Sequence, residues 1–133
     1  MLSGKFFLAI ILITIATSFI QWFFIGFLFH KYQSLTPATW RKENINSYVM
    51  SMIVSLFFAF MFSTIFYLWK TKYGDMHFYD AITFGIFCWL TFSLTIDIGN
   101  AIYVNYSRMF VVGKSLSSLI EFTAASSIAY FFI

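Results

Sequence analysis

The segment FFLAIILITIATSFIQWFFIGFLF, residues 6–29, contains no charged residue and is apolar almost throughout. A membrane-spanning helix needs about 20 consecutive, mostly apolar residues. The segment is much longer than the apolar core of a signal peptide, and no A-x-A-like cleavage site follows it, so we expect an uncleaved transmembrane helix. Three more segments of this kind follow, at residues 45–69, 81–104 and 115–133.

The composition agrees with a chain that lies in lipid. Of its 133 residues, 61% are hydrophobic and only 10% are charged, whereas soluble domains have about 25% charged residues. The apolar runs are continuous, which favours helices over the alternating strands of a barrel. Short linkers make consecutive helices antiparallel. We therefore predict an all-α membrane protein with a single domain, residues 1–133, folded as an antiparallel four-transmembrane-helix bundle.

The linker after the first segment contains the signals of a short helix. Thr36 is a suitable cap, and Pro37 is tolerated at the first helical position. Trp40, Arg41 and Lys42 are residue types that contact lipid headgroups. These residues predict a short interfacial helix over residues 37–43, with an irregular loop as the alternative.

The basic residues are scattered over the linkers and give a net charge of +3. This pattern indicates topology determinants and contacts with membrane lipids, and we expect no nucleic-acid partner. The positive-inside rule predicts that the termini lie on the non-cytoplasmic side, which is the periplasm if the chain lies in a bacterial inner membrane. Three lysines lie on the side of the termini, and five basic residues lie on the other side: Lys31, Arg41, Lys42, Arg108 and Lys114.

Small residues recur at helical spacing in each segment, which is typical of closely packed membrane helices. Two lines are the most regular. The second segment contributes Ser47, Ser51, Ser55, Ala59 and Ser63, and the fourth contributes Gly113, Ser117, Glu121, Ala125 and Ala129. We expect these lines to face the interior of the bundle.

The stretch LTIDIGNAIYVNY, residues 94–106, places acidic and amide side chains inside the third segment. Asp97 and Glu121 lie about 10–12 Å from the same end of the bundle, at 1.5 Å per helical residue. Polar residues of the first two segments lie at a similar depth. The sequence therefore predicts one intramembrane polar site, made of Gln21, Ser51, Asp97, Asn100 and Glu121.

A carboxylate within a membrane is costly unless it is paired or neutralised, and two neighbouring ones should not both be ionised. Two interpretations stay open. The site responds to protons or cations, as in transporters, or it is structural. In the structural case, the acids bond to amides and serines or pair with Arg108 or Lys114.

No motif of a hydrolase, metalloprotease or nucleotide-binding protein is present, so we expect no enzymatic activity, and no catalytic residues. The single Cys88 excludes an internal disulfide and a site with several cysteine ligands. We expect neither a cofactor nor a metal.

Two stretches, GFLFHKYQSLTPATWRKE (26–43) and FCWLTFSLTIDIGNAIYVNYSRMFVVGKSLSSLIEF (87–122), resemble an uncharacterised family of small bacterial integral membrane proteins, classed as a domain of unknown function. The resemblance rests on the basic, tryptophan-containing segment after the first helix and on the asparagine-containing third span. It implies four spans and no particular activity.

Two functions therefore fit the sequence. The chain is a transport-related protein that uses the buried acidic and polar layer, or it is a structural or accessory subunit of a larger membrane complex. In either case we expect a homo-oligomer or a complex with another membrane protein.

Overall fold

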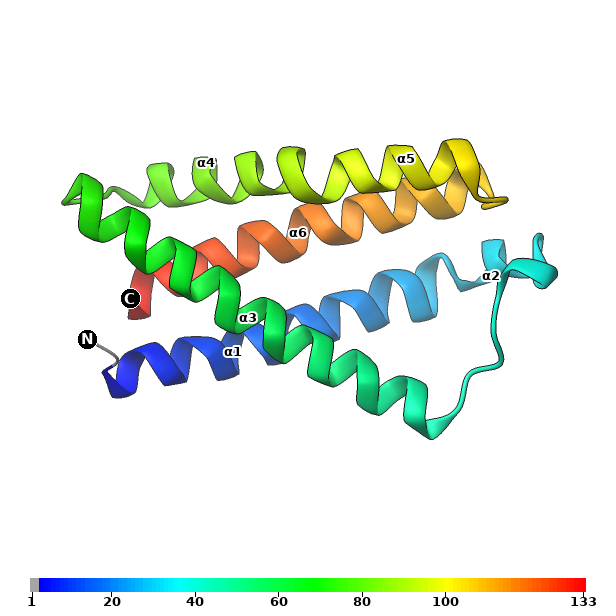
Figure 1. Ribbon diagram of the computed structural model, residues 1–133, viewed down its shortest axis with the longest axis horizontal. Helices are drawn as coiled ribbons and strands as arrows, with labels where there is room; N and C mark the ends of the chain where they lie inside the picture. The colour runs from blue at the N-terminus through cyan, green and yellow to red at the C-terminus, as the bar shows by residue number, and fades with distance from the viewer. Residues whose placement is uncertain (1–2) are drawn as a thin grey trace.

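The computed structural model describes residues 3–133, and this part of the chain is helical without strands (Figure 1). The prediction of an all-α protein is confirmed. The elements in chain order are α1 (Gly4–Gln21), the π-helix η1 (Trp22–Leu28), α2 (His30–Gln33), the 3-10 helix η2 (Pro37–Thr39), α3 (Ile45–Tyr73), α4 (Phe78–Cys88), the π-helix η3 (Trp89–Leu94), α5 (Thr95–Tyr103) and α6 (Arg108–Phe132).

Three helical segments are long and apolar enough to cross a membrane: Gly4–Leu28, Ile45–Tyr73 and Phe78–Tyr103. The first joins α1 to η1, and the third joins α4, η3 and α5. These segments indicate a membrane protein. The helix α6 is not among the three, and it carries Lys114, Glu121 and several serines along its length.

The long segments alternate in direction, so that α1 begins and α6 ends at the same end of the molecule (Figure 1). The helix α6 is central, because it contacts α1, α3, α4 and α5. Its line of small residues is buried along the whole helix, as predicted for an inward face: Gly113, Ser117, Glu121, Ala125 and Ala129.

Glycine allows the closest of these contacts. A Cβ atom at Gly85 of α4 would lie 2.7 Å from the carbonyl oxygen of Phe122 and would also collide with the Ser126 hydroxyl. The backbones of α4 and α6 are thus in near contact, as small residues permit in membrane helix pairs.

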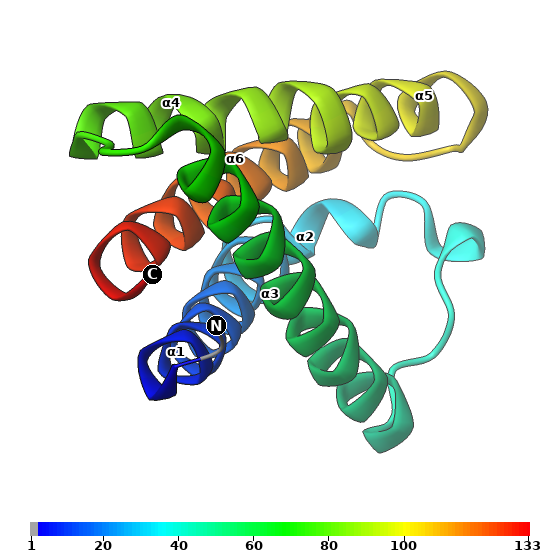
Figure 2. The ribbon, with the colours of Figure 1, turned by 60° about the vertical axis from the view of Figure 1, so that its left-hand side comes forward.

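The two halves of α3 differ in their packing. Ser55, Ala59 and Ser63 are buried against the rest of the molecule, and Phe62 and Phe66 join its aromatic core. Residues 41–54 are all exposed, because α3 diverges from the other helices toward its N-terminal end (Figure 2). The predicted inward line of small residues therefore holds for only half of this helix.

The predicted interfacial helix over residues 37–43 is reduced to the single 3-10 turn Pro37–Thr39. Trp40 is already extended, with φ −102° and ψ 137°. Its ring packs on Phe110, with 4.7 Å between the ring centroids, and on Tyr106 at 5.3 Å. Because Trp40 packs against the start of α6, the chain is extended at this residue and the helix does not continue. The predicted helix over residues 37–43 was therefore wrong beyond Thr39.

The turn between α3 and α4 is shorter than the apolar segments suggested. Lys70 and Lys72 lie in the last turn of α3, where positive charge is favourable. Gly74 ends the helix with a φ of 82°, a conformation that glycine adopts without strain. Asp80 accepts a hydrogen bond from the backbone N–H of His77 at 2.9 Å, which fixes the start of α4.

Candidate functional site

Glu121 lies on the buried face of α6 and bonds to two neighbours. The side-chain amide of Gln21 donates to one carboxyl oxygen at 3.0 Å, and the hydroxyl of Ser117 donates to the other at 2.8 Å. Gln21 is the last residue of α1, and Ser117 is one turn earlier on α6. The contact therefore ties the first long helix to the central one.

Asp97 is the second buried acid, with only 3% of its side chain exposed. The ammonium group of Lys114 lies 3.0 Å from one carboxyl oxygen, and the Ser93 hydroxyl lies 3.5 Å from the other. The lysine is 41% exposed, so the ion pair joins a buried carboxyl to a partly exposed cation. This contact ties α5 to α6.

The two contacts belong to one network. Both Asp97 and Lys114 lie near enough to Glu121 to act on it electrostatically. The network contains two carboxyls and one lysine and joins α1, α5 and α6. A buried charge is tolerated only with such partners, because its removal from water is otherwise unfavourable.

The structure brings together part of the predicted polar site. Gln21, Asp97 and Glu121 belong to the network, and Asn100 is half-buried one turn after Asp97 on α5. Ser51 does not join them, because it is exposed on the diverging half of α3. The prediction assumed straight helices side by side, in which Ser51 has the same depth as the other four residues. Because α3 diverges, Ser51 lies away from them.

Irregular helical turns adjoin this network. The π-helix η1 begins directly after Gln21. At its C-terminal end the backbone N–H of Phe29 donates to the carbonyl of Phe24 at 2.8 Å. The π-helix η3 includes Ser93 and ends three residues before Asp97. Such turns are rare and occur often at functional sites.

Sequence reasoning did not assign every partner. The sequence left the cationic partner open between Arg108 and Lys114 and allowed serine partners without naming them. The structure gives Lys114 and Ser93 to Asp97, and Ser117 to Glu121. Trp89 was missed. Its indole N–H donates to the Ser115 carbonyl at 3.1 Å and the Ser118 hydroxyl at 3.2 Å, which fixes η3 on α6.

The residues predicted to contact lipid headgroups lie in different surroundings. Trp40 is half-buried against Tyr106 and Phe110, and its indole N–H donates to the Thr36 hydroxyl at 3.3 Å. Arg41 and Lys42 are exposed. The aromatic contact explains why Trp40 faces the protein, while contact of the two basic residues with lipid stays a prediction.

The helices and the polar network define the class to which this chain belongs, a helical membrane protein with a buried polar network. No known protein family, curated protein or solved structure matches the chain.

Proposed function

We propose that this protein is a structural or accessory component of a larger membrane assembly, in which the buried acids hold its own helices together. Its partner is a second copy of the chain or another membrane protein. It carries out no reaction and has no cofactor.

One observation carries this proposal: each buried carboxyl already has partners within the chain. Lys114 pairs with Asp97 at 3.0 Å, while Gln21 and Ser117 bond to Glu121 at 3.0 and 2.8 Å. An acid that binds a transported ion needs to exchange partners during the cycle, whereas a structural acid needs fixed ones. Gln21 and Lys114 each reach their carboxyl from a different helix, as expected of groups that hold a bundle together.

The proposal includes α6 as a fourth membrane span. This helix has 25 residues, about 37 Å at 1.5 Å per residue, and it buries Ser117, Glu121 and Ser126. The buried polar face supports a span in protein surroundings, since the acid that would be unfavourable in lipid is covered. We place the protein in the bacterial inner membrane with periplasmic termini, on the strength of the positive-inside rule and the family resemblance.

A proton- or cation-responsive transporter is the second candidate. The π-helical turns beside Gln21 and Asp97 favour it, because irregular turns let helices rearrange around a site. The presence of two buried acids in one polar network is a further argument, since intramembrane acids mark ion and proton pathways in transporters.

Flux through reconstituted vesicles distinguishes the two candidates. Purified protein is placed in vesicles that contain a pH-sensitive dye, and proton entry is measured under an imposed pH gradient with sodium or potassium outside. We expect the rates of vesicles with wild-type protein and with Asp97→Asn to equal those of empty vesicles. A cation-dependent flux that Asp97→Asn abolishes, with the variant still folded, would contradict the accessory role and support transport.

The assembly itself is tested by extraction in native nanodiscs without detergent. We expect a particle larger than one copy of the chain, measured by mass. A population that is entirely monomeric and without a second protein would contradict the proposed assembly.

A further inference from the structure

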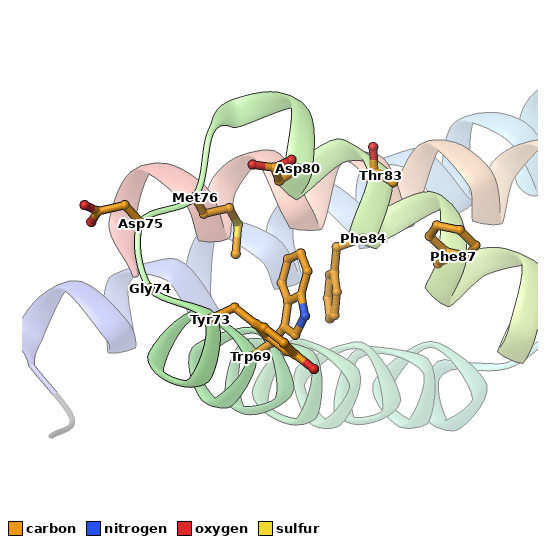
Figure 3. Close-up of a pocket in the computed structure, with 9 residues that line it drawn as sticks. All are labelled: Trp69, Tyr73, Gly74, Asp75, Met76, Asp80, Thr83, Phe84 and Phe87. Carbon is orange, nitrogen blue, oxygen red and sulfur yellow. The ribbon is translucent and has the colours of Figure 1, made fainter.

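A cavity of about 490 Å³ lies between the end of α3 and the first turns of α4 (Figure 3). This volume is within the range of pockets that bind small molecules, about 300–1,000 Å³. The cavity is formed by the short turn between these two helices, and the buried network of Asp97 and Glu121 contributes no residue to it.

Aromatic rings form the wall of the cavity. Trp69 and Phe84 stack with 4.6 Å between centroids, and Tyr73 lies 6.0 Å from Trp69 at a steep angle. Ring faces attract cations. Lys72 illustrates this property, because its ammonium group lies 5.6 Å from the centroid of the Tyr73 ring.

Two acidic residues, Asp75 and Asp80, are among those that line the cavity. The Asp75 side chain points away from the aromatic rings, at the outer edge of the cavity (Figure 3). Asp80 is held in place by the backbone N–H of His77 at 2.9 Å. Within residues 3–133 the only ion pair is that of Asp97 with Lys114, so no lysine or arginine of this part pairs with either cavity acid. The cavity therefore offers negative charge that is not neutralised by an ion pair.

The polar and apolar parts of the cavity are separated. Asp75 and Asp80 lie at one side, and Phe87 lies at the other (Figure 3). Phe87 follows the start of α4 at Phe78 by nine residues, about 14 Å along the helix. In a membrane, the acids would then lie at the headgroup level and Phe87 among the acyl chains, which matches the shape of an amphiphile.

We propose that this cavity binds an amphipathic ammonium compound. Its cationic group lies by Asp80, with Asp75 adding negative charge at the outer edge, and its apolar part lies along Trp69, Phe84 and Phe87. The ammonium group comes from a lipid headgroup or from a free organic amine. This site depends neither on the accessory role nor on the buried acids.

The test uses the whole chain in nanodiscs of phosphatidylglycerol, which has no ammonium group. Benzyltrimethylammonium is titrated by calorimetry, with empty nanodiscs as background, and neopentylbenzene serves as the neutral compound of the same shape. We expect saturable binding of the cation at least about tenfold tighter than that of the neutral compound, because the rings and carboxylates favour charge. Equal binding of the two compounds would overturn the proposal.

Variants locate the site. Asp80→Asn keeps an acceptor for the His77 N–H but removes the charge, and Asp75→Asn removes the charge of an exposed residue that supports no fold contact. Asp80→Asn should weaken binding of the cation at least about fivefold and Asp75→Asn by a smaller factor, because each removes Coulomb attraction, whereas Glu43→Gln, an exposed acid outside the cavity, should leave it unchanged. If Asp80→Asn fails to fold, Asp75→Asn still decides, and unchanged affinity in Asp75→Asn would overturn the proposal.

The source of the ammonium group is decided by lipid composition. The titration is repeated with phosphatidylethanolamine in the nanodiscs, and with a neutral glycolipid at the same fraction as the control. If the lipid occupies the cavity, the affinity for benzyltrimethylammonium falls with phosphatidylethanolamine alone. If the affinity is the same with both lipids, a free amine is the ligand. Both results require the charge-selective binding above.

Discussion

Two pairs of carboxyl groups lie at different places in this protein and in opposite surroundings. Asp97 and Glu121 are buried among α1, α5 and α6, and each carboxyl lies within hydrogen-bond distance of a side chain on another helix. Asp75 and Asp80 lie at the turn between α3 and α4, in an open aromatic cavity where neither is in an ion pair of the described chain. The buried acids are thus bonded to other side chains, whereas Asp80 accepts one backbone hydrogen bond from His77 and neither acid of the turn has a cationic partner in the described chain.

This difference indicates separate roles. A buried acid with internal partners stabilises the arrangement of helices, and its exchange for an apolar residue should affect folding. An exposed acid without a partner adds little to folding, so its exchange should affect binding alone. Measurements of the free energy of unfolding of matched variants test whether the two regions differ in this way.

The largest effect is expected for Asp97→Leu. The change leaves Lys114 without its partner and removes the acceptor of the Ser93 hydroxyl. The free energy of unfolding should fall by about 1 to 3 kcal/mol, less than for a fully buried pair because the lysine is 41% exposed. Asp75→Leu, its control in the other region, should stay within about 0.5 kcal/mol of wild type. The measurement is reversible unfolding in mixed micelles. Equal losses of unfolding free energy in the two variants would contradict the difference between the regions.

A smaller effect is expected for Ser117→Ala. The variant removes the hydrogen bond that the Ser117 hydroxyl donates to Glu121 within α6, and the free energy of unfolding should fall by about 0.5 to 1.5 kcal/mol, as for a typical intramolecular hydrogen bond. Ser51→Ala is the matched control, since Ser51 is exposed on α3, and its effect should lie within about 0.5 kcal/mol. The same unfolding experiment applies. A greater loss for Ser51→Ala would show that the diverging half of α3 is covered in the membrane.

The fold was predictable where local rules decide it. The length of the apolar segments predicted the long helices, and the line of small residues on α6 correctly predicted its buried face. Charge and backbone rules also explain why α3 extends to Tyr73, since Lys70 and Lys72 suit its last turn and Gly74 ends it. The predicted apolar segment nevertheless ended at residue 69, because the two lysines interrupt the apolar run.

The site was only partly predictable, because its composition depends on helix directions. Depth along the helices was sufficient to group Gln21, Asp97 and Glu121. It failed for Ser51, since no local pattern shows that α3 diverges. Trp40 is a similar case. Its helix signals were outweighed by contacts with Phe110 and Tyr106, which are distant in sequence.

The cavity could not be derived from the sequence, because its wall requires the stacking of Trp69 on Phe84 across two helices. The sequence placed Asp75 and Asp80 in one exposed turn and gave no reason to connect them with an aromatic surface. The short turn at residues 74–77 is what brings the acids and the rings together.

The central claim is that the buried acids hold the helices together, and a double-mutant cycle on Asp97 and Lys114 tests it most directly. The free energies of unfolding of wild type, Asp97→Leu, Lys114→Met and the double variant are compared in the same micelles. If the pair is structural, the double variant should be more stable than the sum of the single losses predicts, by about 1 kcal/mol or more. Additive losses, with no coupling between the two positions, would contradict the claim.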